Sequence, residues 1–181
     1  MKGVVFNILE AFIIETFGDE TMEEIYSTVA FSGDTPPFIG PETYPDSDLF
    51  AMVTLLAEMK TLDLDDVIFE LGEFMFPVFA KKYPIFFENI HSSIEFLKTV
   101  NDIIHVEVKK LFEDANPPMV KVKQTNEDSV KLYYYSDRKL CKLLEGLLEG
   151  LAFHFGQKVS YEQTICMKDG GDQCVYKINY F

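Results

Sequence analysis

Hydrophobic residues recur at helical spacing through most of the first two-thirds of the chain. Val5, Ile8, Leu9, Phe12 and Ile13 predict a helix over residues 2–17 that ends at Gly18. Further helices are predicted over about 20–31, from a cap at Asp46 or Ser47 to about 60, and over about 64–82. The Pro- and Gly-rich stretch 32–48 predicts a long surface loop between the second helix and the third.

The next predicted helix covers about 92–114 and begins at Ser92 or Ser93. Its hydrophobic stripe consists of Leu97, Val100, Ile104, Val108 and Leu111. The sequence Asn-Pro-Pro at 116–118 stops the helix, because neither proline can donate a helical hydrogen bond.

After Pro118 the hydrophobic period changes from helical spacing to alternation. Two hairpins are predicted, one with its turn at 126–128 and one with its turn in the sequence DGGD. A helix over about 137–155, which ends at Gly156, separates the two hairpins. The chain is therefore expected to be one α+β domain over 1–181. A helical part, about 1–116, is joined to a four-stranded antiparallel sheet with a crossing helix, about 117–181.

Composition and charge narrow the possible functions. A formal net charge of −14 would repel phosphate backbones, so nucleic acid is not an expected partner. No apolar run is long enough to span a membrane, and Glu10 and Glu15 interrupt the apolar N-terminus, which is not read as a signal peptide. Three cysteines, an odd number, favour the reducing cytoplasm. No nucleophile–base pair or phosphate-binding loop is recognisable, so an enzyme is not expected.

His105 is the first candidate for chemistry. Unlike His91 and His154, which lie near predicted helix ends, it lies in the middle of a helix, with Val108 and Phe112 on its face. A partly desolvated imidazole there stays neutral and is able to ligate iron. The alternative is a structural histidine on an apolar helix face.

A second candidate is the set Tyr134, Ser136 and Arg138. If the strand continues, alternation directs a phenol, a hydroxyl and a guanidinium to one side, and together they suit a carboxylate ligand. The alternative is an edge strand with an exposed arginine.

The cysteines are the third candidate. Cys166 and Cys174 lie symmetrically about Gly170, and a regular hairpin would place their Cβ atoms about 4.5–5.5 Å apart. Cys141, in the first turn of the preceding helix, is able to reach the same end of the sheet. Converging thiols suit zinc or redox chemistry; the alternative is three small buried hydrophobic residues.

Together and in this order, these segments resemble the haem nitric oxide/oxygen-binding (H-NOX) domain family, over essentially the whole chain. The segments that carry the resemblance are the start MKG, IHVEVKKL followed by ANPP, the pattern Tyr-x-Ser-x-Arg at 134–138, and EGLLEG. The resemblance implies haem b between the helical part and the sheet. It makes His105 the axial iron ligand, assigns Tyr134, Ser136 and Arg138 to the haem propionates, and places Pro118 against the haem. Gly72 and Gly146 match the glycines about which the family's two parts pivot.

The resemblance also implies a gas selectivity. Oxygen-binding members have a distal tyrosine five residues after the signature arginine, and Leu143 stands there in this chain. The other expected distal residues, Val5, Leu9, Phe74 and Met75, are also apolar. A sensor that binds nitric oxide and carbon monoxide at ferrous haem, and excludes oxygen, is expected. Its signal would be a weakened bond between His105 and the iron, passed to a separate histidine kinase or cyclic-di-GMP enzyme.

Some members of the family bind zinc through three cysteines and a histidine. Cys141, Cys166 and Cys174 match the cysteine positions, but Gln163 replaces the histidine, so zinc would need Gln163, Glu162 or water as its fourth ligand. Two other functions stay open: a thiol or zinc redox sensor, and a haem-free module that binds a hydrophobic ligand.

Overall fold

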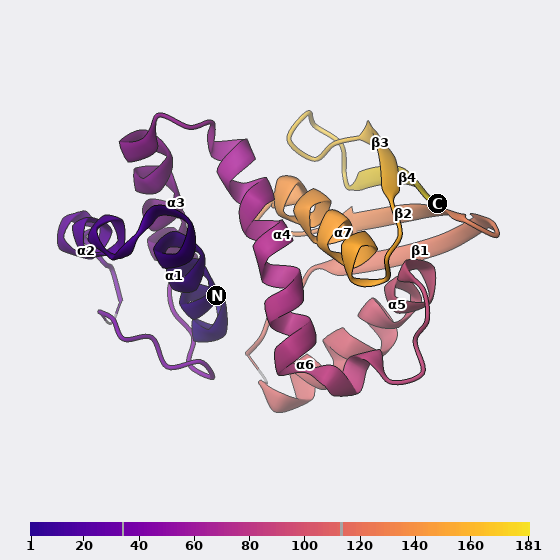
Figure 1. The fold of residues 1–181 in the computed structure, drawn as a ribbon, viewed down its shortest axis with the longest axis horizontal. Coiled ribbons are helices and arrows are strands. Elements are labelled where there is room, and N and C mark those ends of the chain that lie inside the picture. Colours follow the sequence, from indigo (N-terminus) through magenta and orange to yellow (C-terminus); the bar gives the residue numbers. More distant parts are fainter. Residues whose placement is uncertain (34, 113) are drawn as a thin grey trace. The chain divides into compact units, whose positions relative to one another are not determined.

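Helices form the first part of the chain and a four-stranded sheet the last part (Figure 1). The computed structural model describes residues 1–33, 35–112 and 114–181. The chain divides into two units, Met1–Leu71 and Gly72–Phe181. The α+β fold class predicted from the sequence is confirmed. The unit boundary at 71/72 differs from the place near 116 where the sequence pattern changes from helix to strand, and the assignment of one domain stays a prediction.

The first unit is helical. It contains α1 (Gly3–Phe17), α2 (Asp19–Thr28), α3 (Asp46–Lys60) and the start of α4 (Leu64–Lys82), which continues into the second unit. Gly18 ends α1 as predicted, with a φ of 90° that suits glycine. The predicted cap of α3 is wrong: Pro45 is the N-cap, and the Asp46 carboxylate instead pairs with the Met1 ammonium group at 2.6 Å.

The helix expected over 92–114 is three consecutive helical segments. Ser92 caps α5 (Ser93–Thr99) by accepting a hydrogen bond from the Glu95 amide, and η2 (Val100–Ile104), a π-helical segment, leads into α6 (His105–Leu111). Leu111 is 68% exposed, so its predicted place in the buried stripe is wrong. The π segment lengthens the hydrogen-bond spacing by one residue, which breaks the helical period assumed for the stripe. Glu113, which the predicted helix over 92–114 includes, lies outside the described part of the chain.

The sheet has the strand order β1-β2-β4-β3, and every neighbouring pair is antiparallel. Its strands are β1 (Met119–Asn126), β2 (Ser129–Tyr135), β3 (Val159–Ile165) and β4 (Cys174–Tyr180). One face carries the apolar side chains of the second unit's core, which also includes side chains of α5 and α7 (Cys141–His154). A short 3₁₀ helix, η1 (Pro84–Phe87), follows α4.

The start of α7 differs from the sequence prediction. The helix begins at Cys141 instead of about residue 137, because Asp137 and Arg138 form a turn and Lys139 adopts a left-handed φ of 51°. The Lys139 amide donates to the Ser136 carbonyl at 3.0 Å, which closes this turn. A short connection therefore separates β2 from α7, and Ser136 and Arg138 both lie in it.

Helices α4 and α7 cross at glycines. A Cβ atom at Gly72 would lie 2.4 Å from the Leu143 carbonyl oxygen and 3.0 Å from the Gly146 Cα atom. A Cβ atom at Gly150 would lie 2.6 Å from the Cβ atom of Phe76. The missing side chains let the two backbones approach one another directly.

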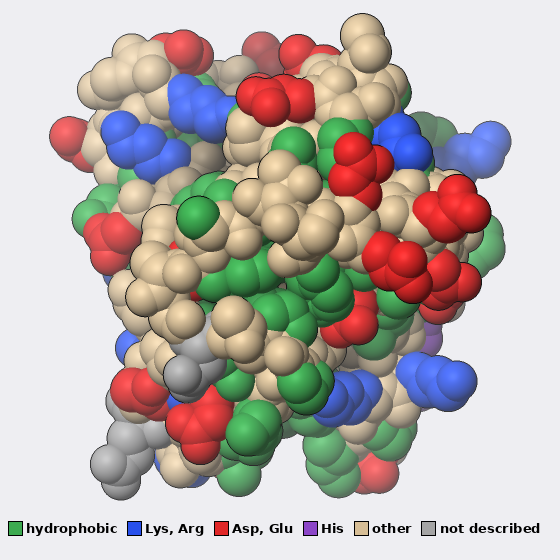
Figure 2. Space-filling view, turned by 90° about the vertical axis from the view of Figure 1, so that its left-hand side faces the viewer, with side chains coloured by type: hydrophobic (Ala, Val, Ile, Leu, Met, Phe, Trp, Pro, Cys, Tyr) green, Lys and Arg blue, Asp and Glu red, His purple; other side chains and the backbone are tan. Residues whose placement is uncertain are grey.

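Charge is distributed very unevenly between the two units. Residues 1–71 carry two lysines against fifteen carboxylates, a formal net charge of −13, whereas residues 72–181 carry fourteen basic against fifteen acidic side chains, a net charge of −1. Figure 2 shows one face of the molecule, on which exposed hydrophobic side chains lie among Asp and Glu side chains, with Lys or Arg side chains also in view. Among the described residues, no helix combines the length and the hydrophobicity that crossing a membrane requires.

Candidate functional site

His105 is the first residue of α6, immediately after the π segment. Burial lowers the pKa of its imidazole to about 4; the backbone of Pro118 acts in the opposite direction, and the charge of Lys109 lowers the pKa further. Within the described residues, its Nδ1 atom is buried and has no hydrogen-bond partner. At neutral pH His105 is therefore an uncharged imidazole, the form that binds a metal ion.

Tyr134 and Ser136 form a buried pair of hydroxyl groups at the end of β2. Tyr134 is 4% exposed and Ser136 5%. Burial raises the pKa of Tyr134 to about 12, and a hydrogen bond with the Ser136 side chain lowers it in part. Tyr134 is thus a protonated phenol at neutral pH and able to donate a hydrogen bond.

Arg138 contacts this pair from a turn, and not from the strand that the alternation of side chains predicted. Because β2 ends at Tyr135, Arg138 lies in the following turn, where its amide donates to the Ser136 Oγ atom at 3.3 Å. Its Nη1 atom donates to the Asn116 carbonyl at 2.8 Å. Asp137 supports the turn, since its carboxylate accepts from the side-chain Nδ2 atom of Asn116 at 3.3 Å and from the Tyr135 hydroxyl at 2.9 Å.

These contacts connect the predicted axial ligand to the predicted carboxylate-binding group within one unit. The Pro118 backbone is near enough to His105 to affect its pKa. The Asn116 carbonyl, two residues earlier in the chain, accepts from Arg138, whose amide donates to Ser136 beside Tyr134. A neutral imidazole with a buried, unpartnered ring nitrogen suits an iron ligand, and a phenol, a hydroxyl and a guanidinium suit propionates. The residues present therefore fit haem.

The expected distal residues are divided between the two units. Phe74 and Met75 on α4 and Leu143 on α7 belong to the second unit, where Met75 is 3% exposed. Val5 and Leu9 lie on α1 in the first unit, where Leu9 is fully buried. The shared pocket of all five side chains stays a prediction.

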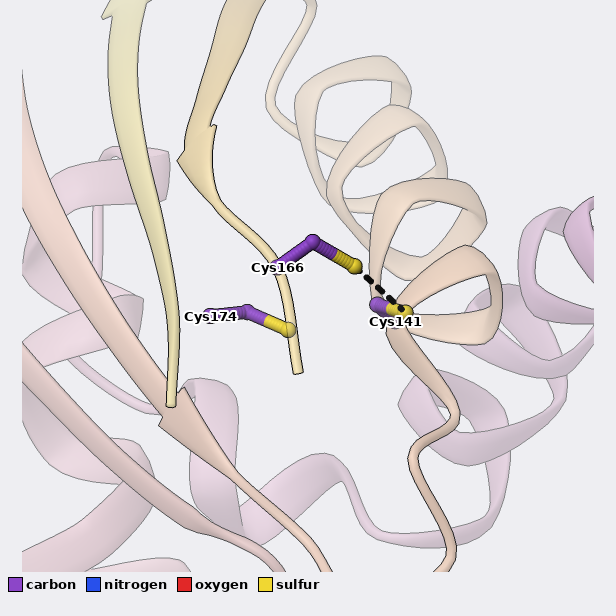
Figure 3. Close-up of side chains that lie close together, drawn as sticks. All are labelled: Cys141, Cys166 and Cys174. Carbon is purple, nitrogen blue, oxygen red and sulfur yellow. Dashed lines mark hydrogen bonds between the residues drawn. The ribbon is translucent and has the colours of Figure 1, made fainter. Parts of the chain in front are cut away.

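The three cysteines converge in the second unit (Figure 3). Cys141 begins α7, Cys166 follows the last residue of β3, and Cys174 begins β4. Their Sγ atoms all lie within 4.8 Å of one another, and those of Cys141 and Cys166 are 4.0 Å apart. Burial raises the pKa of the Cys141 thiol to about 12, and Cys174 and Cys166 raise it further. Two ligands on tetrahedral zinc lie about 3.8 Å apart for Zn–S bonds near 2.3 Å, so the cluster suits zinc.

Gln163 and Glu162 differ in their position relative to this cluster. Gln163 is opposite Tyr176 in the ladder, on the face of the sheet that carries Cys174, and its Nε2 atom is buried without a partner among the described residues. Glu162 lies on the other face, where its carboxylate pairs with Lys177 at 3.0 Å. Gln163 is thus the better placed of the two for a fourth ligand.

Sequence reasoning missed the parts played by Asn116 and Asp137. The sequence presents Asn116 only as part of a helix stop, yet its backbone carbonyl and its side-chain amide both contact the turn that contains Arg138. The signal that could have revealed it is an Asn before two prolines, since a residue that precedes proline is held in an extended conformation and its backbone is left for other contacts.

The chain matches the model of the Haem-NO-binding family over residues 2–163, and it belongs to that family. The match includes His105, Pro118 and the whole of the segment Tyr134–Arg138. A search of curated proteins found no match.

Solved structures of H-NOX proteins have the same fold as this chain. An H-NOX protein from S. oneidensis in the Fe(II)NO ligation state is 29% identical, with a TM-score of 0.92 over 100% of this chain and 99% of that chain. The NMR structure of an H-NOX domain from Shewanella oneidensis in the Fe(II)CO state is also 29% identical, with a TM-score of 0.89 and the same coverage of both chains. Unliganded H-NOX from K. algicida, 24% identical with a TM-score of 0.85, shares the fold over 100% of this chain and 97% of that chain.

Proposed function

We propose that this protein is a haem-based sensor of nitric oxide. The observation that carries the proposal is that the second unit holds both halves of a haem site: the neutral, buried imidazole of His105, and the hydroxyl and guanidinium groups of Tyr134, Ser136 and Arg138, which the Asn116 carbonyl joins to the 116–118 segment. Relatives whose structures were solved with nitric oxide and with carbon monoxide on Fe(II) support the same ligand class.

Each residue has a separate part in this proposal. His105 binds the iron of haem b, Pro118 contacts the haem, and Tyr134, Ser136 and Arg138 bind its propionates. When bound, haem supplies the ferrous iron that takes up nitric oxide or carbon monoxide. His105 begins α6, and the Asn116 carbonyl joins the 116–118 segment to Arg138, so a change at the His105 ligand would reach both α6 and this connection.

Selectivity follows from the distal side chains. Val5, Leu9, Phe74, Met75 and Leu143 are all apolar and have no donor to offer a bound ligand. Oxygen on ferrous iron needs such a donor, whereas nitric oxide and carbon monoxide do not, so the protein discriminates against oxygen.

Absorption spectroscopy tests the proposal directly. The ferrous protein is expected to show a Soret band that shifts under nitric oxide and under carbon monoxide but is the same in air and under nitrogen. His105→Gly is expected to lose or strongly change this band, whereas the control His91→Gly, at an exposed histidine, keeps it. No Soret band after haem reconstitution, or an unchanged spectrum in His105→Gly, would refute the assignment.

We further propose that the output leaves through a separate cytoplasmic partner, a histidine kinase or a cyclic-di-GMP enzyme, and that this chain itself is not an enzyme. Movement about Gly72 and Gly146 would carry the change, since the backbones of α4 and α7 meet at these residues. The test is the partner's activity with and without nitric oxide, measured with wild-type protein and with His105→Gly.

A second candidate function is a structural or redox-active zinc site at Cys141, Cys166 and Cys174. It is favoured by the convergence of the three Sγ atoms within 4.8 Å. The fourth ligand would be Gln163 or water, because Glu162 pairs with Lys177 on the opposite face of the sheet.

A further inference from the structure

The sheet has a second face, which the core of the second unit does not use. Because side chains alternate along each strand, Val120, Leu132, Tyr176 and their neighbours fill the core, and the residues between them form the outer face. This outer face carries the side chains of three cross-strand rows that the register defines.

The middle row is basic. Lys123 on β1 is opposite Lys131 on β2, which is opposite Lys177 on β4, and Glu162 on β3 ends the row with an ion pair to Lys177 at 3.0 Å. The row on one side of the basic row consists of Lys121, Tyr133, Val175 and Ile165. The row on its other side includes the small polar pair Ser129 and Asn179. Ile165 is 48% exposed, and the Lys131 ammonium lies over the Tyr133 ring at 5.3 Å.

Protection of a sheet edge accounts for only part of this pattern. Lysines on β1, an edge strand, prevent the strand from pairing with another chain. Lys131 and Lys177, however, are on the two central strands, where no edge needs protection. Like charges directly opposite one another destabilise a sheet, and the ion pair of Lys177 with Glu162 offsets this for only one of the three lysines in the row.

The charge of the whole chain makes the row more unusual. The first unit has a formal net charge of −13, yet four of the chain's fifteen lysines gather on one sheet face of the second unit. The net charge of −14 on the whole chain disfavours an extended polyanion such as nucleic acid or an anionic membrane. A protein can present a local group of carboxylates and avoid this repulsion. Arginine, which is preferred for phosphate, is absent from the face.

We propose that the outer face of the sheet, defined by Lys121, Lys123, Lys131, Lys177, Tyr133 and Ile165, is a docking surface for a partner protein that presents a local acidic patch. The lysines attract and orient the partner's carboxylates, while Tyr133 and Ile165 supply apolar contact area beside them. This surface does not depend on haem, and it is on the face of β2 opposite to Tyr134.

NMR titration of the ¹⁵N-labelled protein with a short glutamate peptide tests the proposal. Shifts are expected to concentrate in β1, β2 and β4 at low salt and to shrink at about 0.15 M ionic strength, where the Debye length is about 8 Å. Lys131→Glu/Lys177→Glu is expected to weaken binding about tenfold. Lys81→Glu/Lys82→Glu, with the same charge change at the end of α4, changes it less than twofold.

Three results would overturn the proposal. The first is equal weakening in both double variants, which would mean that only net charge matters. The second is binding of phosphatidylglycerol vesicles or an oligothymidylate strand at this face without binding of the peptide. The third is sedimentation that shows reversible self-association, lost in Lys131→Glu/Lys177→Glu, because the face would then bind a second copy. Circular dichroism checks that both variants are folded.

Discussion

Gly72→Ala offers the most direct test of the packing in the second unit. The new Cβ atom would lie 2.4 Å from the Leu143 carbonyl oxygen, about 1 Å short of the 3.4 Å at which ordinary contact begins, and 3.0 Å from two further backbone atoms of α7. No side chain is able to rotate away, so the two helices must separate. Overpacking of this kind costs about 1–3 kcal/mol.

An opposing effect reduces this cost. Alanine favours a helix over glycine by about 1 kcal/mol, so a backbone clash at the upper end of the range leaves a net loss of about 2 kcal/mol. For a chain of this size that lowers the melting temperature by about 4–8 °C. Thermal unfolding followed by circular dichroism measures it.

Gly40→Ala is the matched control, because its Cβ atom would have no neighbour within 4 Å. The expected change in its stability is within about 0.5 kcal/mol. A melting temperature that rises in Gly72→Ala would refute the close crossing of α4 and α7, since helix propensity would then be the only effect at work.

Three further changes test separate parts of the molecule. Burial and Glu73 raise the pKa of Glu149, so ionisation of Glu149 destabilises the fold as pH rises through this raised value. Glu149→Gln should therefore be more stable than wild type at pH 7. The gain should vanish below about pH 4, near the pKa of an unfolded Glu, because the carboxyl group is then protonated in both states. Equal gains at both pH values in denaturant unfolding would contradict this. Leu143→Tyr adds a donor at the expected distal position and should make the ferrous spectrum respond to air; an unchanged spectrum would place residue 143 outside the distal pocket. Cys174→Ser should abolish zinc binding in metal analysis, whereas Glu162→Gln, on the opposite face of the sheet, should keep it; full zinc content in Cys174→Ser would remove the thiol cluster as the site.

Much of the fold was predictable because the spacing of hydrophobic residues indicates which face of each helix or strand is buried. Helix α4 was predicted at its observed bounds, and both hairpins were predicted with their turns. The same reasoning failed where backbone geometry departs from the regular period. Leu111 is exposed after the π segment, and α7 begins four residues late because Lys139 adopts a left-handed conformation.

The candidate site shows the same division between side-chain pattern and backbone contact. His105, Tyr134 and the cysteines could be selected from residue type and spacing. The link between Arg138 and the Asn116 carbonyl could not, because it joins two turns that are distant in sequence and depends on a backbone acceptor that every residue type has.

The π segment before His105 has a consequence for the direction of the imidazole. An α-helix turns by about 100° and rises about 1.5 Å with each residue. Deleting one residue within Val100–Ile104 would therefore rotate every later position of α6 by about that angle about the helix axis. The ring of His105 would then face a different neighbour, although the composition of the helix would hardly change. Length in this short segment, more than the identity of its side chains, decides where His105 points.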